Sequence, residues 1–224
     1  MRPGQESIDI RRLISPLRYD VIVRARFLIE LRNLHAEPMA ALQEFALEDP
    51  YFTWFKQVES ARFFPTSLDD RELLLQRFQL RVARAITTLR SYERLGFDAR
   101  HPVTLGKTSG GAVTDLGTVL SKSLHIRDGC HRLALLWMND QPLEPAMYRV
   151  HSFRGPALDN TALLLQHMNI DDDEYARFLS HAFAGEEYSE LSELRRSVAE
   201  VSPDRLAEFD EIVRVHGRAR RTAG

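Results

Sequence analysis

Residues 123–138 read SLHIRDGCHRLALLWM and predict a short strand that turns directly into a helix. The first residues alternate between apolar and polar side chains, as in a strand with one buried face. Asp128 and Gly129 interrupt this alternation, and residues of these types are typical of turns. Residues 133–138 then form the apolar side of a helix. We therefore expect a strand, a glycine turn and a helix in immediate succession.

This turn predicts a binding site for an anion, and phosphate is the anion we expect. The first backbone N–H groups of a helix have no partners within the helix, and they lie at the positive end of its dipole. A helix that starts at a glycine turn therefore offers these groups to a ligand. The first residues of this helix are Cys130, His131 and Arg132, so reactive or cationic side chains lie beside the N–H groups.

The sequence DGCHRLA, which begins at Asp128, resembles the signature of the ParB/sulfiredoxin superfamily. In that superfamily, a strand, a turn of this kind and a helix bind nucleotide phosphates. Residues 89–97 and 101–105 are similar to the upstream half of the pattern, which is a helix, a glycine, a proline and a first strand. The resemblance covers about Val82 to Val150. It implies an α+β fold, with a small mixed sheet and helical N-terminal and C-terminal extensions packed on it.

The Asp-Gly-x-His-Arg form of the turn is closest to the free amino-acid kinases of the superfamily. The resemblance therefore implies a nucleotide-dependent phosphotransferase that acts on a small hydroxylated metabolite, with ATP or ADP and Mg²⁺ as cofactors. Gly129, Cys130, His131 and Arg132 would hold phosphate. Asp128 would bind the metal ion or the substrate.

The kinases of this superfamily take a catalytic carboxylate from the region before the first strand. The resemblance implies that Glu93 is a candidate for this base, in addition to Asp128 and His131 as catalytic residues. Asp98, Asp69 and Asp70 also precede the first strand, and the sequence does not choose among these four carboxylates.

Two alternative functions follow from the same residues. The order Gly-Cys-His-Arg is similar to that of sulfiredoxins, which would make Cys130 the reacting thiol of an ATP-dependent enzyme. A binding module without catalysis, whose partner binds only in one nucleotide state, is the other alternative. ParB proper carries an arginine-rich phosphate motif and a helix-turn-helix domain, and we find neither in the sequence.

Composition favours a cytoplasmic protein that does not bind nucleic acid. The chain has 30 Lys and Arg residues and 32 Asp and Glu residues, whereas proteins that bind DNA phosphates usually have more basic than acidic residues. One cysteine excludes an intrachain disulfide and fits a reducing compartment. No apolar run reaches the length of a membrane span, and the N-terminus lacks the pattern of a signal peptide. The composition leaves the oligomeric state open.

We expect a single compact domain with four regions: a helical N-terminal region at 1–81, the superfamily-like core at 82–151, a helical C-terminal region at 152–217 and a disordered tail at 218–224. Helices are predicted at 16–34, at 38–49, from an N-cap at Ser67 to Gly96, and from an N-cap at Ser202 onward.

Two conspicuous clusters are interpreted as structural. The aromatic residues of 51–55 predict a buried helix contact rather than a stacking surface for a base, because aromatic side chains supply much of a protein core. The four consecutive acids at 171–174 predict an acidic helix N-terminus rather than a metal site.

Overall fold

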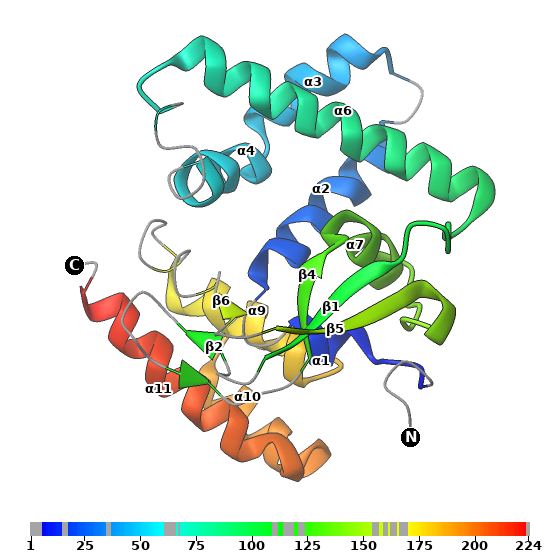
Figure 1. Cartoon of the computed structure of the whole chain (residues 1–224). Coiled ribbons are helices and arrows are strands. Elements are labelled where there is room, and N and C mark those ends of the chain that lie inside the picture. The colour runs from blue at the N-terminus through cyan, green and yellow to red at the C-terminus, as the bar shows by residue number, and fades with distance from the viewer. Residues whose placement is uncertain are drawn as a thin grey trace.

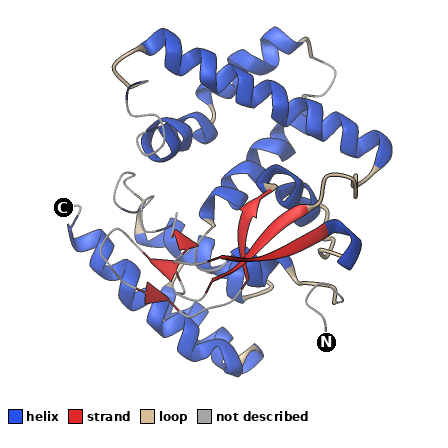
Figure 2. Ribbon diagram, viewed as in Figure 1, coloured by secondary structure: helices blue, strands red, loops and turns tan. Residues whose placement is uncertain are grey.

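The computed structural model describes residues 6–14, 18–34, 37–60, 66, 68–108, 112–113, 119–120, 124–153, 157–158, 161, 165 and 170–222. Helices and a small mixed sheet make up this part of the chain, which confirms the predicted α+β class (Figures 1 and 2). One hydrophobic core runs through it, with residues from Ile10 near the N-terminus to Val215 near the C-terminus.

The main sheet has three strands in the order β4-β1-β5. The central strand β1 (Val103–Thr108) pairs antiparallel with β4 (Leu124–Asp128) and parallel with β5 (Tyr148–Phe153). A short 3₁₀ helix, η3 (Pro145–Met147), precedes β5. Strands β1 and β4 lie where the sequence predicted them, although β1 continues beyond Leu105. A second small sheet joins β2 (Ala112–Val113), β3 (Val119–Leu120) and β6 (Ala157–Leu158).

The predicted strand, turn and helix are confirmed. Strand β4 ends at Asp128, and helix α7 (Cys130–Met138) begins two residues later. Gly129 between them has φ +96°, in the left-handed region that favours glycine. A Cβ atom there would lie 3.2 Å from Val103 Cα and 3.2 Å from Arg132 Nη2. The glycine therefore allows both the sharp turn and its close packing on β1.

Helix α2 (Tyr19–Asn33) packs along α7 and is the most deeply buried helix of the N-terminal region. A short helix, α1 (Ile10–Ile14), precedes it. The sequence predicted one helix from Pro16, but Pro16 lies outside the described residues and α2 begins at Tyr19. Asp20 and Arg24 are buried within α2 although they are charged. The charged residues of α2 are consequently not confined to its exposed face, which carries Arg26, Glu30 and Asn33.

Helices α3 (Met39–Glu48), α4 (Pro50–Trp54) and α6 (Arg71–Leu95) lie together at one end of the molecule, with a π-helical segment η1 (Phe55–Ser60) after α4 (Figure 1). Asp70 caps α6 by accepting a hydrogen bond from Leu73 N, whereas the predicted cap at Ser67 lies outside the described residues. The helix ends at Gly96, as predicted.

The aromatic residues of 51–55 belong to the core, as predicted. Tyr51, Trp54 and Phe55 are almost completely buried. Phe78 of α6 packs against this group, with its ring centroid 5.2 Å from that of Phe55 and 5.7 Å from that of Tyr51. These contacts attach α4 and η1 to α6.

The C-terminal region consists of α9 (Asp172–Phe183), α10 (Leu191–Val201), the 3₁₀ helix η4 (Pro203–Arg205) and α11 (Leu206–Thr222). Asp171 caps α9 by accepting from Glu174 N, which confirms that residues 171–174 form an acidic helix N-terminus. Ser202 makes no side-chain cap. The backbone is helical through Thr222, whereas the sequence predicted a disordered tail from residue 218. None of the helices that the structure describes is long and apolar enough to span a membrane.

Candidate functional site

Asp128 and Arg132, two of the predicted phosphate or metal residues, are paired with each other. Arg132 Nη2 lies 3.4 Å from Asp128 Oδ2, and Arg132 Nη1 donates a 2.9 Å hydrogen bond to Pro102 O. Asp128 is 77% exposed. Arg132 thus connects the first turn of α7 to the start of β1. The sequence predicted a phosphate contact for this guanidinium and not this structural role.

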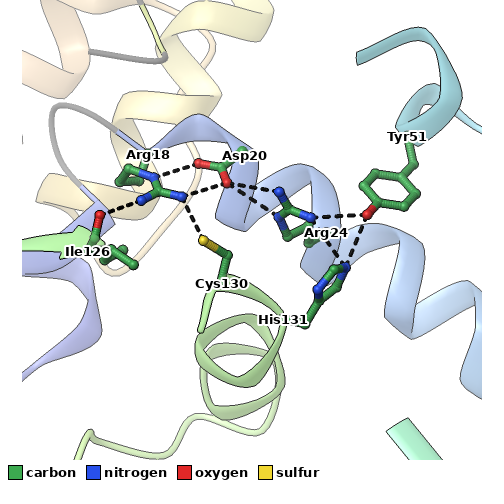
Figure 3. Close-up of polar contacts among 7 residues, drawn as sticks. All are labelled: Arg18, Asp20, Arg24, Tyr51, Ile126, Cys130 and His131. Carbon is green, nitrogen blue, oxygen red and sulfur yellow. Dashed lines mark hydrogen bonds and ion pairs between the residues drawn. The ribbon is translucent and has the colours of Figure 1, made fainter. Parts of the chain in front are cut away.

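Cys130 faces a buried arginine of the N-terminal region. Arg18 Nη2 donates to Cys130 Sγ at 2.6 Å, and Arg18 Nη1 donates to Ile126 O at 2.6 Å (Figure 3). A single guanidinium therefore contacts both the end of β4 and the first residue of α7. Arg18 holds the strand and the helix on either side of the turn in fixed relative positions.

Asp20 is shared by two buried arginines. Its carboxylate accepts two hydrogen bonds from Arg18, at 2.7 and 2.8 Å, and a longer one of 3.3 Å from Arg24 (Figure 3). Burial alone would lower the pKa of both arginines, but the carboxylate of Asp20 helps to raise them. Two guanidinium groups against one carboxylate leave an excess of positive charge beside the first turn of α7.

His131 joins the same network from the second position of α7. Its Nε2 atom lies 3.2 Å from Arg24 Nη1 and 3.0 Å from Tyr51 Oη (Figure 3). Burial, with Arg24 and Arg81 nearby, moves the pKa of His131 well below its ordinary value, so the imidazole is neutral at pH 7. Because a guanidinium only donates, Nε2 accepts and Nδ1 carries the proton. His131 therefore does not supply the positive charge that the sequence predicted.

The positive charge comes instead from α6. Arg77, Arg81 and Arg84 line a pocket of about 390 Å³ together with Phe55, Leu80 and His131. We call this the arginine pocket. The three arginines are four and three residues apart, a spacing that places them on one face of a helix. No carboxylate is among the described residues that line the pocket.

The arginines of the pocket lie close to aromatic and charged groups. The guanidinium of Arg81 lies over the ring of Phe55, 5.4 Å from its centroid. Burial and the nearby charge of Arg24 lower the pKa of Arg81. Like charges at this helical spacing also repel each other. Guanidinium groups can bind anions through charge-assisted hydrogen bonds, so the chemistry of this lining is compatible with an anion.

The N-terminal end of helix α7 lies beside the same pocket. It begins at Gly129 without any side-chain cap, and its second residue, His131, lines the arginine pocket. The positive end of the α7 dipole consequently lies beside the pocket. Cys130 is the neighbouring residue, but it faces Arg18 and is not among the residues that line the pocket.

The predicted base candidates lie elsewhere. Glu93 pairs with Arg32 (Oε1–Nε 3.3 Å), and Arg32 also donates to Asn139 at the C-terminal end of α7. A nine-residue helix is about 13 Å long, so these contacts place Glu93 near the end of α7 that lies opposite the turn. Of the other candidates, Asp98 pairs with Arg100 and Asp70 caps α6. Asp69 is exposed.

Sequence reasoning missed the residues that complete this site. The spacing of Arg77, Arg81 and Arg84 was a detectable signal, since it places three like charges on one helix face. No comparable signal marked Arg18 and Arg24, whose partners are far away in the sequence.

The described residues contain no group of three or more His, Cys, Asp or Glu side chains arranged to hold a metal ion. Comparisons of the chain with protein-family models, with curated proteins and with solved structures find no match.

Proposed function

We propose that the protein is a nucleotide-dependent phosphotransferase that holds the nucleotide phosphates in the arginine pocket. The observation that supports this proposal is the set of three arginines around His131 at the N-terminal end of α7. The kinase reaction, with a small hydroxylated metabolite as acceptor, rests on the resemblance of the DGCHRLA turn to the ParB/sulfiredoxin superfamily.

The charges of the pocket suit a phosphate chain. Planar guanidinium groups bind phosphate oxygens in pairs, so three of them can hold a phosphate chain. ATP or ADP is the cofactor we propose, and Mg²⁺ would accompany it. Magnesium commonly binds proteins through one or two carboxylates together with phosphate oxygens. Asp128 is the carboxylate nearest the turn, but Arg132 already pairs with it, so we assign no catalytic step to a metal ion at this position.

Replacing Arg81 by alanine is expected to weaken ATP binding by about 1.5–3 kcal/mol, because the change removes a charge-assisted hydrogen bond to phosphate. Titration calorimetry with and without Mg²⁺ measures this loss. Arg94→Ala is the matched control, since Arg94 is an exposed residue of the same helix and does not line the pocket. If ATP and ADP fail to bind the intact protein, or if both variants lose the same affinity, the phosphate site is not the arginine pocket.

Phosphate transfer needs a separate test. A kinase consumes nucleotide faster when its acceptor is present, and the product gains the mass of a phosphate group. Small hydroxy compounds, including serine and sugars, are the acceptors to screen. Nucleotide binding without any phosphorylated acceptor, together with a protein partner retained only in the presence of nucleotide, would favour the alternative of a binding module.

The contact between Arg18 and Cys130 is the observation that keeps a thiol enzyme as the second candidate. Cys130→Ser is expected to retain nucleotide turnover within about tenfold, or ~1.4 kcal/mol, if the protein is a kinase. The serine hydroxyl has nearly the same size and can accept the hydrogen bond from Arg18. A sulfiredoxin-like enzyme loses its reacting atom in this variant and becomes inactive, while nucleotide binding stays intact. If Asp128 contacts the substrate, as the resemblance implies, Asp128→Asn has the opposite pattern, with a strong loss of kinase activity and little effect on thiol chemistry.

A further inference from the structure

Leu80 gives the arginine pocket an exposed apolar surface. It lies on α6 and is 57% exposed, whereas Phe55, the other apolar residue of the described lining, is 1% exposed. The guanidinium of Arg81 also lies over the Phe55 ring, 5.4 Å from its centroid. Within the described lining, Leu80 is therefore the apolar side chain that a ligand in the pocket can contact.

The arginines of the pocket lie between Leu80 and the buried face of α6. A helix turns about 100° per residue, so each position can be compared with that of Phe78, which is fully buried. In one direction around the helix, Arg81 lies roughly 60° from Phe78, Arg77 roughly 100° and Arg84 roughly 120°. Leu80 follows at roughly 160° in the same direction. From the core outward, the α6 wall of the pocket therefore changes from guanidinium groups to an apolar rim.

The position of Leu80 distinguishes it from other exposed leucines. Such leucines are common on protein surfaces, and exposure alone does not mark a site. Leu95, the last residue of α6, is 65% exposed and does not line the pocket. Leu80 shares its wall with three arginines, and sites for small molecules typically combine apolar surface with a few polar groups that fix orientation. The wall is therefore complementary to a ligand with an anionic part and an apolar part.

We propose that Leu80 contacts the nucleoside of the bound nucleotide, beyond the phosphates. The inference rests on the proposed function, which places the phosphates against the arginines. A nucleotide has phosphates at one end and a planar base at the other, and a base that covers Leu80 removes apolar surface from water. A leucine side chain has no hydrogen-bonding group that could distinguish the edges of different bases. We therefore expect ATP and GTP to depend on Leu80 to the same degree.

The test compares ATP with inorganic tripolyphosphate, which is the phosphate chain without a nucleoside. Titration calorimetry of the full chain at one Mg²⁺ concentration measures the affinity for both ligands. Leu80→Ala should weaken ATP binding about three- to tenfold and leave tripolyphosphate binding unchanged. Arg81→Ala should weaken the binding of both ligands. Leu95→Ala is the matched control and should change neither affinity.

A second variant, Leu80→Met, keeps an apolar side chain of similar size and should retain ATP binding. Thermal unfolding of each variant without ligand shows whether the fold is retained. If Arg81→Ala weakens tripolyphosphate binding but Leu80→Ala leaves ATP binding unchanged, the inference about Leu80 is overturned and the phosphate site stands. Equal losses of ATP and tripolyphosphate affinity in Leu80→Ala, or equal losses of ATP affinity in Leu80→Ala and Leu95→Ala, also overturn it. If neither ligand binds the intact protein, the phosphate site itself is wrong and the inference fails with it.

Discussion

Asp20→Ala is expected to lower the free energy of unfolding by about 3–5 kcal/mol, because it leaves two buried guanidinium groups without their shared carboxylate. Asp20, Arg18 and Arg24 are at most 9% exposed, so water cannot replace the lost charge. Arg18 also holds Cys130 at the start of α7, and the loss should therefore extend to the turn itself. Urea denaturation followed by circular dichroism measures the change.

Asp210→Ala is the matched control for this prediction. Asp210 also accepts two short hydrogen bonds from one arginine, Arg195, at 2.7 and 2.8 Å. Both of these side chains are about half exposed, so solvent screens the pair and its removal should cost much less. Equal losses in the two variants would show that burial of Asp20 does not determine its contribution. Asp20→Asn keeps the shape of the side chain and isolates the effect of charge.

Phe78→Ala is expected to destabilise the protein by about 3–5 kcal/mol, as is typical when a fully buried aromatic ring is removed. Phe78 has no exposed surface, and its ring packs against Tyr51, Phe52 and Phe55. The cavity left behind lies between α6 and the segment that carries Tyr51. Thermal and urea unfolding give the loss of stability.

Leu80→Ala provides the comparison on the same helix. Leu80 is 57% exposed, so its side chain has little buried surface to lose and the change in stability should be small. A similar loss for both variants would mean that the aromatic cluster contributes no more to the core than an exposed leucine. A large loss for Phe78 alone agrees with the interpretation of residues 51–55 as buried structure.

The ends of individual strands and helices were predictable where neighbouring residues in the sequence determine them. The change from strand to helical periodicity around Gly129 marks the end of β4 and the start of α7, and the left-handed conformation of Gly129 agrees with it. Gly96 marks the end of α6 for the same kind of reason. The start of α6 was misplaced because Ser67 and Asp70 are both good N-cap residues, and sequence alone does not decide which of them caps the helix.

The candidate site was predictable only in part, because its partners come from distant segments. The sequence pointed to His131 as a binding residue, and the structure places His131 at the arginine pocket. Its lowered pKa depends on burial and on Arg24 and Arg81, which no local pattern connects to it. Arg132 had the residue type expected for phosphate binding, yet its position beside Pro102 gives it a structural contact instead.

The network around Asp20 also bears on how the protein folds. Arg18 contacts Ile126 and Cys130 across 108 and 112 positions of sequence, and Arg24 contacts His131 across 107. Contacts of such long range form only after the entropy of closing the intervening loop has been lost, so they tend to form late. Helices α2 and α7 can form locally before this step, but the turn residues have no fixed partners until both helices have docked. A folding intermediate that contains only its local helices would therefore have secondary structure without a binding site.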